Sequence, residues 1–160
     1  MDAVIDPLIS LAFSTYSNRG AYALLVGSGV SRAAGVPTGW EVVLDLARRV
    51  AEVDWDDAGE DPGGWYRDKY GQEPDYSKLL EALARRPAER SRLLRAYFEP
   101  SDEEREQGLK IPTPAHRAIA RLVREGYVRV ILTTNFDRLL ETALADEGIV
   151  PTVIDRKSVV

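Results

Sequence analysis

The pattern of apolar and polar positions predicts strands alternating with helices. Two short apolar runs, Ala21–Val26 and Val128–Leu132, are typical of parallel strands that are buried on both faces. A third run, Ile149–Ile154, is a candidate for a further strand. Between these runs, apolar residues recur every three or four positions, as they do along one face of a helix. The sequence therefore predicts an α/β fold with a parallel sheet and flanking helices.

Start and stop signals bound the expected helices. A first helix begins at Asp6-Pro7, carries an apolar stripe of Leu8, Leu11 and Ala12 that is expected to pack beside the first strand, and ends at Gly20. Further helices are predicted for residues 38–51, 76–85, 87–98, 113–126 and 139–148. Trp40 comes soon after the first strand, and we expect it to pack in the core rather than to cover a ligand.

The segment Asp54–Asp75 is acidic, rich in glycine and proline, and predicted to be a long loop. Its neighbourhood holds the aromatic residues Trp55, Trp65, Tyr66, Tyr70 and Tyr76. These side chains either stack on a nucleotide base or fasten the loop to the body of the protein. Ser101–Gly108 is highly charged and is expected to be a solvated turn or helix end. Residues 39–110 together are expected to form a helical insert that caps the sheet.

The first strand leads into a glycine turn. Gly27-Ser28-Gly29 comes directly after Val26, and the next five residues are compatible with a helix. A strand, a glycine turn and a helix start present backbone N–H groups and a positive helix end to a phosphate, which glycine allows to come close. We therefore hypothesise that this turn holds the pyrophosphate of a dinucleotide, although a purely structural turn would use the same residues.

Two common nucleotide sites are disfavoured at this turn. Arg32 stands where the usual dinucleotide fingerprint has its third glycine, so an ordinary nicotinamide dehydrogenase is not expected. No Gly-Lys-Ser/Thr comes after the turn, which excludes a P-loop.

A second polar turn lies after the second strand. Thr133, Thr134, Asn135 and Asp137 stand directly at its carboxyl end, where open α/β sheets bind their ligands. The alternative is that Asn135 only caps the next helix. His116 is the single histidine of the chain. We expect it to be a buried, hydrogen-bonded structural residue rather than a catalytic base.

Three motifs occur in a defined order along the chain. They are Gly27-x-Gly29-x-Ser31-x-x-x-Gly35-Val36-Pro37, the helix start that holds Pro114 and His116, and Thr133-Thr134-Asn135-Phe136-Asp137. In these motifs the chain, from about Ala21 to Asp155, resembles the sirtuin-like family. The resemblance implies a Rossmann-like fold that binds NAD as its substrate. It implies nucleotide contacts by Gly27, Ser28, Gly29, Ser31, Pro37, Thr133 and Thr134, and catalytic roles for Asn135 and Asp137.

Two departures narrow the resemblance. The chain contains no cysteine, so it cannot build the four-cysteine zinc ribbon of protein-deacylating sirtuins, and no metal is expected. Thr38-Gly39-Trp40 also stands where deacylases have Asp-Phe-Arg. The chain is thus similar to the zinc-free branch found in bacterial anti-phage defence. That similarity implies an NAD hydrolase that releases nicotinamide and ADP-ribose, acting as a homo-oligomer or with a partner defence protein.

The sequence also bears on other functions and on the location of the protein. The runner-up is a non-catalytic module that senses NAD or ADP-ribose, and a protein deacylase is disfavoured. The family's catalytic histidine, in a His-Gly pair, is expected beyond Val160, so the 160 residues are expected to be the N-terminal part of a longer domain. A net charge of −5 disfavours a nucleic-acid partner. No apolar run suits a membrane span or secretion signal, so we expect a cytoplasmic protein.

Overall fold

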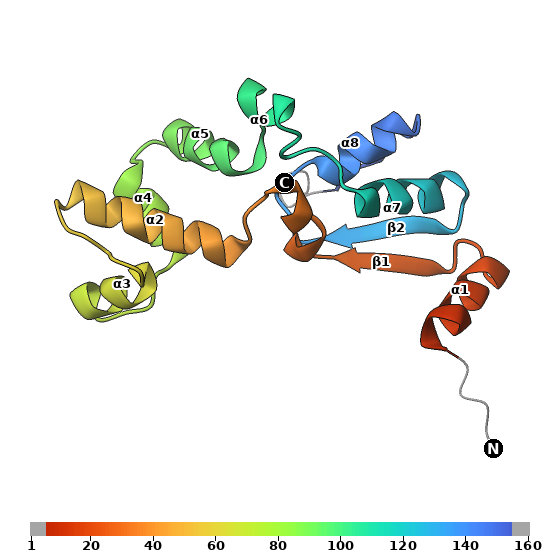
Figure 1. The fold of residues 1–160 in the computed structure, drawn as a ribbon, viewed down its shortest axis with the longest axis horizontal. Helices are drawn as coiled ribbons and strands as arrows, with labels where there is room; N and C mark the ends of the chain where they lie inside the picture. The colour runs from red at the N-terminus through yellow and green to blue at the C-terminus, as the bar shows by residue number, and fades with distance from the viewer. Residues whose placement is uncertain (1–5, 155–160) are drawn as a thin grey trace, which may run out of the picture. The chain divides into compact units, whose positions relative to one another are not determined.

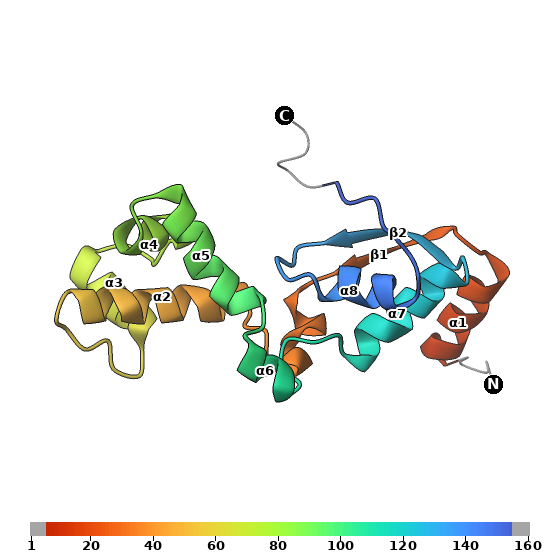
Figure 2. The same cartoon turned by 90° about the horizontal axis from the view of Figure 1, so that it is seen from above.

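The computed structural model describes residues 6–154 and divides into two compact units (Figures 1 and 2). The first unit consists of the chain up to Ser31 together with the chain from Ile111 onward, and the second unit is Arg32–Lys110. The described part is mixed α/β, with helices and a two-stranded parallel sheet. Among residues 6–154, no helix combines the length and the apolar character needed to cross a membrane.

The sheet lies in the first unit. Strand β1 (Tyr22–Val26) pairs in parallel with β2 (Val128–Thr133), so that Leu24 lies opposite Ile131 and Val26 opposite Thr133. Helix α7 (Pro114–Arg124) precedes β2, and α8 (Leu139–Asp146) comes after it. Both helices lie on the same side of the sheet (Figure 2). The two strands and their parallel pairing are confirmed.

The expected burial of these strands was wrong. Leu25 on β1 is 76% exposed and Leu132 on β2 is 57% exposed. The reason is that the described sheet has two strands, so each strand is an edge. The third strand expected at residues 149–154 does not form. Ile149 instead donates its N–H to the Leu144 carbonyl at the end of α8, and Pro151 has no N–H to offer a sheet ladder.

Helix α1 (Pro7–Ser17) begins as predicted, because the Asp6 carboxylate accepts the Leu8 N–H at 2.8 Å. The expected packing of its apolar stripe was wrong, since no residue of α1 is buried and Leu8 is 75% exposed. The helix is attached instead through aromatic contacts near its end. The ring of Tyr16 lies 6.1 Å from that of Tyr127, which also stacks under the Arg19 guanidinium.

The helix expected after the glycine turn is absent. The chain forms two three-residue 3₁₀ turns instead, η1 (Ser28–Val30) and η2 (Arg32–Ala34). Gly35, at a φ of +77°, ends the second turn by donating its N–H to the Arg32 carbonyl. Pro37, two residues later, has no N–H. The dipole of a long helix therefore does not point at this turn.

The second unit is helical. Its helices are α2 (Gly39–Val53), α3 (Pro62–Tyr70), α4 (Tyr76–Leu83), α5 (Pro87–Phe98) and α6 (Asp102–Glu106). The predicted capping box of α2 is confirmed, with Thr38 and Glu41 exchanging their bonds. The side chains of Val42, Leu46 and Leu79 are fully buried at the centre of this unit.

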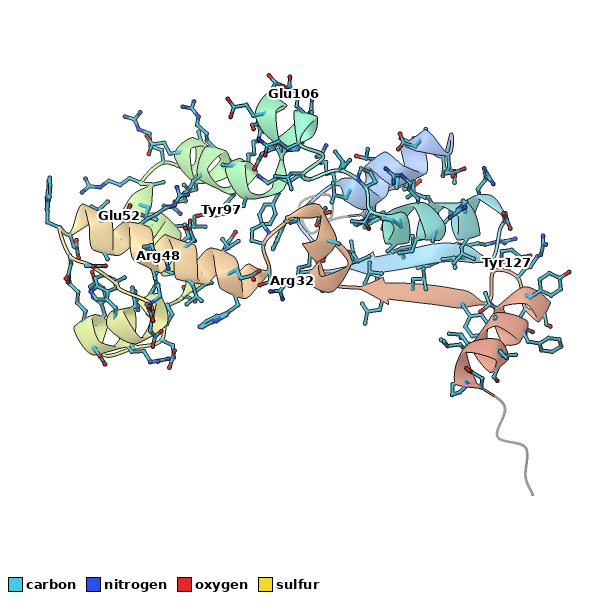
Figure 3. All side chains as sticks on the ribbon, in the orientation of Figure 1. Arg32, Arg48, Glu52, Tyr97, Glu106 and Tyr127 are labelled. Carbon is cyan, nitrogen blue, oxygen red and sulfur yellow. The ribbon has the colours of Figure 1, made fainter. Side chains whose placement is uncertain are left out.

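Two aromatic side chains of the second unit, Trp40 and Tyr97, differ in how they contact the rest of the unit. Trp40 is 54% exposed, so its expected core packing was wrong. It lies in the first turn of α2, before the buried stretch that starts at Val42. Tyr97 on α5 reaches back to α2 and hydrogen-bonds the Asp45 carboxylate (Figure 3). Partial burial, together with this bond, raises the pKa of the Tyr97 phenol.

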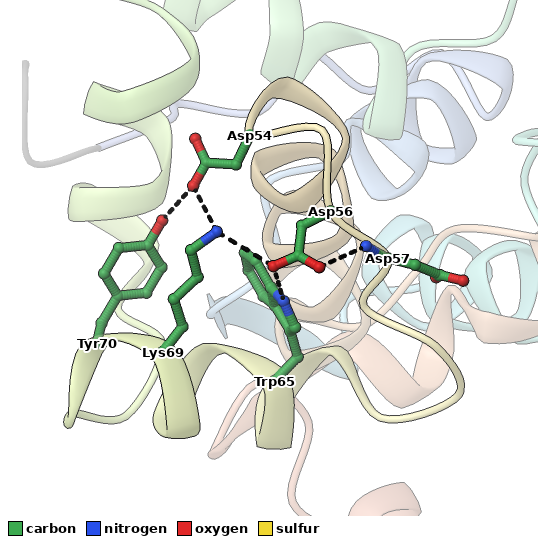
Figure 4. A network of polar contacts seen from close by, with 6 residues as sticks. All are labelled: Asp54, Asp56, Asp57, Trp65, Lys69 and Tyr70. Carbon is green, nitrogen blue, oxygen red and sulfur yellow. Dashed lines mark hydrogen bonds and ion pairs between the residues drawn. The ribbon is translucent and has the colours of Figure 1, made fainter.

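Helix α3 forms within the segment predicted to be a loop. Asp61 accepts the Gly64 N–H at 2.8 Å, and Pro62 occupies the first helical position. The aromatic residues of α3 fasten it to the end of α2 (Figure 4). Trp65 Nε1 donates to Asp56 at 3.0 Å, Tyr70 donates to Asp54 at 2.7 Å, and Lys69 Nζ lies within 3.2 Å of both carboxylates. These bonds hold the pKa values of both aspartates below their usual range.

Candidate functional site

The two polar turns lie side by side in the first unit. Val26 and Thr133, the last residues of the paired strands, stand opposite each other. The Thr134 N–H donates to the Val26 carbonyl at 3.3 Å. A Cβ on Gly27 would stand 3.6 Å from Thr134 Oγ1. The structure thus brings the glycine turn and the turn after β2 together at the carboxyl end of the sheet.

Ser31 connects the two turns through a buried hydrogen bond. Its side chain is fully buried, and its Oγ accepts a hydrogen bond from Asn135 Nδ2 at 3.1 Å. The same Oγ lies 3.3 Å from Nε2 of His116, which is 1% exposed. The prediction of a buried, hydrogen-bonded His116 is confirmed.

The hydrogen bonds around His116 define its tautomer. The Thr113 N–H donates to His116 Nδ1 at 3.1 Å, and Thr113 Oγ1 lies 2.7 Å from the same nitrogen. Since Nδ1 accepts, a neutral ring carries its proton on Nε2 and donates it to Ser31. Burial lowers the pKa of His116, and the nearby Asp137 opposes that shift. The ring is therefore neutral at neutral pH.

Asn135 carries an orphaned polar atom. Its backbone N–H donates to Thr133 Oγ1 at 3.0 Å, and its Nδ2 donates to Ser31. Its Oδ1 is buried and has no hydrogen-bond partner among residues 6–154. A buried carbonyl oxygen without a donor costs about 1–3 kcal/mol. Such a cost is typical of sites where a ligand or water completes the bonding.

A small cavity adjoins Asn135. It has about 10 Å³ of room, which is close to the least that holds one water molecule. Its lining comes from both strand ends and from α7 and α8: Val26, Val30, His116, Ile119, Thr133, Asn135, Asp137, Leu140 and Glu141. In its present form the cavity takes a single small molecule such as water.

Asp137 has a structural role in this arrangement. It is 8% exposed, and its Oδ1 accepts the Leu139 N–H at 3.1 Å at the start of α8. The interpretation of Asn135 as the cap of this helix was therefore wrong, because Asp137 supplies that bond. Asp137 also lines the cavity beside Asn135.

The glycines of the first turn are not required by the backbone. Gly27 has an ordinary φ of −124°, and Gly29 is not among the glycines with positive φ. A Cβ added to Gly29 would meet no heavy atom within 4 Å. Gly35 differs, since its φ is +77° and its Cβ would stand 3.2 Å from a Leu109 methyl. A purely structural requirement for glycine therefore explains Gly35 but not Gly29.

The turn also leaves backbone donors at its start. Within η1 the N–H groups of Val30 and Ser31 donate to the carbonyls of Gly27 and Ser28. The N–H groups of Ser28 and Gly29 precede these bonds, as the first N–H groups of any helical turn do. Gly29 is exposed and Ser28 is half-buried.

The remaining predicted site residues belong to different units. Thr133 and Thr134 are exposed at the end of β2 in the first unit. Pro37 is half-buried in the second unit, immediately before the Thr38 cap of α2.

The pairing of His116 with Ser31 and Thr113 was not among the expectations from the sequence. The bond from His116 to Ser31 joins distant parts of the chain and has no local signal. Thr113-x-x-His116 does have the spacing of a capping box, with histidine in place of the usual Glu or Gln, so a local signal for this pair was present in the sequence.

A scan of known protein families finds no family model that matches the chain, and a search of curated proteins finds no match either. The resemblance to the sirtuin-like family therefore remains a prediction from its three motifs.

Proposed function

We propose that the first unit binds NAD and that the protein hydrolyses the bond between nicotinamide and ribose. The observation that carries this proposal is the buried, unpartnered Asn135 Oδ1, held beside the glycine turn by Ser31. A two-stranded parallel sheet with helices before and after β2 is compatible with the Rossmann-like fold that this function implies. The sequence resemblance adds a zinc-free sirtuin-like domain in bacterial defence, working as an oligomer or with a partner protein.

The pyrophosphate would bind at the glycine turn. The N–H groups of Ser28 and Gly29 are suited to an anion, and the lack of a side chain at Gly29 lets the phosphate approach. Ser31 would support this site from the interior, because its side chain is fully buried. Its Oγ accepts bonds from His116 and Asn135 and so holds the Asn135 amide beside the turn.

The chemistry is a displacement at the anomeric carbon of the ribose. The carbon–nitrogen bond breaks and its electron pair leaves with nicotinamide, so positive charge develops on the sugar. A water oxygen then bonds to the anomeric carbon and loses one proton to solvent. Asn135 Oδ1 would accept a hydrogen bond from this water or from a ribose hydroxyl, holding it in position. Nicotinamide is a good leaving group, so positioning supplies most of the catalysis in this proposal.

A second candidate is a module that binds NAD or ADP-ribose without cleaving it. The engagement of His116 favours this alternative. Both nitrogens of its ring are bonded, to Thr113 and Ser31, so His116 is not available as a base.

Release of nicotinamide from NAD separates the two candidates. We expect the full-length protein that contains this domain to release nicotinamide, and Asn135→Ala to reduce the rate at least 100-fold, about 2.7 kcal/mol in the activation barrier. The variant should keep its circular dichroism spectrum, since the side-chain bond that it loses is the one from Asn135 Nδ2 to Ser31 Oγ, which still has His116 as a partner. The exposed neighbour Phe136→Ala is the matched control.

NAD binding without nicotinamide release would favour the sensing module. Unchanged turnover in Asn135→Ala would remove this residue from the mechanism. Absence of both binding and turnover would overturn the proposed function.

A further inference from the structure

A continuous set of hydrogen bonds runs from α7 to the orphaned oxygen of the site. The Thr113 N–H bonds His116 Nδ1, His116 Nε2 bonds Ser31 Oγ, and Ser31 Oγ bonds Asn135 Nδ2. Thr113, Ser31 and His116 are all buried, at 7%, 0% and 1% exposure. The first two bonds have fixed directions, because the series starts at a backbone N–H that can only donate. In the third bond, Asn135 Nδ2 donates to Ser31 Oγ.

We infer that His116 is a positioning residue that acts through Ser31 to set the orientation of the Asn135 amide. With Nε2 as donor, Ser31 Oγ uses its lone pairs to accept from His116 and from Asn135 Nδ2. The amide nitrogen of Asn135 is thereby held against Ser31, and Oδ1 is left as the free acceptor. Reversing the amide would require the Ser31 hydroxyl to turn its hydrogen toward Oδ1, and would place a donor where the free acceptor now is. This inference rests on the proposed function only for the identity of the ligand.

The chemistry of imidazole explains why this position needs more than an apolar side chain. A neutral ring accepts on one nitrogen and donates on the other, which matches Thr113 on one side and Ser31 on the other. A protonated ring would turn Nδ1–H toward the Thr113 N–H, and two donors would then face each other. Two carboxylates, those of Asp137 and Glu141, line the same cavity as the His116 ring. The orientation of Asn135 should therefore be lost at acid pH.

Two substitutions of His116 distinguish the roles of its two ring nitrogens. His116→Gln can keep a donor near the position of Nε2, whereas His116→Asn reaches only the position of Nδ1 and leaves Ser31 without its donor. Ser31→Ala removes the intermediate partner without changing α7. The readout is nuclear magnetic resonance, in which the single histidine gives one unambiguous imidazole signal.

The wild-type protein should show the Nε2–H tautomer and slow hydrogen exchange at the side-chain amide of Asn135. Exchange at this amide should accelerate at least tenfold in His116→Asn and in Ser31→Ala, and stay near the wild-type rate in His116→Gln. An Nδ1–H tautomer would overturn the inference. So would an Asn135 amide that is unaffected in folded His116→Asn. If His116→Asn does not fold, Ser31→Ala alone decides the question.

Nicotinamide release tests the functional consequence. We expect kcat to fall at least tenfold in His116→Asn, with KM for NAD changed less than threefold, and to recover in His116→Gln. The acid limb of the pH profile for kcat should track the titration of the His116 signal. If neither the wild-type protein nor any variant binds NAD, the proposed function is wrong. The tautomer and exchange measurements still decide the role of His116 in that case.

Discussion

Substitution of Gly29 separates a structural glycine from one that a ligand requires. The residue does not have a positive φ, and a Cβ would find no heavy atom within 4 Å. Alanine therefore causes no strain in the folded state and restricts the unfolded chain. A glycine-to-alanine change at such a position stabilises a protein by about 0.4–1 kcal/mol. The free energy of unfolding in urea should thus be unchanged or slightly higher for Gly29→Ala.

Binding should respond in the opposite direction. A side chain at position 29 would occupy the space through which a pyrophosphate approaches the N–H groups of Ser28 and Gly29. Hydrogen bonds to a charged group contribute about 1.5–3 kcal/mol each. Weakening one of them is enough to raise the Kd for NAD about tenfold, which corresponds to about 1.4 kcal/mol. Gly29→Val, with its branched side chain, should raise Kd further.

Isothermal titration calorimetry with NAD measures this effect. Gly39→Ala is the matched control, because it too has no positive φ and no heavy atom within 4 Å of a Cβ. It lies at the start of α2 and should leave Kd unchanged. Undiminished NAD affinity in folded Gly29→Val would refute the assignment of the turn to the pyrophosphate. A clear loss of stability in Gly29→Ala would show that the glycine is structural.

Two further predictions concern stability. Leu46→Ala, at a fully buried position, should lower the free energy of unfolding, measured in urea, by about 2–5 kcal/mol. Trp55→Ala, at 98% exposure, should change it by less than about 0.5 kcal/mol. Equal effects of the two substitutions would contradict the assigned core. Because burial lowers the pKa of His116, the unfolded chain takes up this proton more readily, and stability should fall as the pH drops below about 6.5. His116→Gln should flatten this slope, and an unchanged slope would remove His116 as its cause.

Local signals in the sequence determined most of the helices. Caps act within one turn, so Asp6-Pro7, Thr38-x-x-Glu41 and Thr113-Pro114 each marked a helix start that the structure confirms. Helix α3 was missed because glycine and the acidic composition outweighed the Asp61-Pro62 signal. The aromatic residues of that helix are held by carboxylates at the end of α2, and periodicity along the chain does not report such contacts.

The meeting of the two polar turns was also within reach of the sequence. Parallel strands end at the same edge of a sheet, so the polar residues after Val26 and Leu132 come together once the strands pair. The residue types at the end of each strand are a local property of the chain. Whether other elements cover a strand is not a local property of the chain, and the predicted burial of Leu25 and Leu132 was wrong for that reason.

The sequence by itself therefore determined where most of the helices start, where the two strands lie, and which polar residues reach the edge of the sheet. Only the tertiary structure decided how those residues bond to one another. Ser31 and His116 are separated by 85 positions, and Ser31 and Asn135 by 104. A hydrogen bond depends on position and angle to within fractions of an ångström, and packing alone supplies that precision.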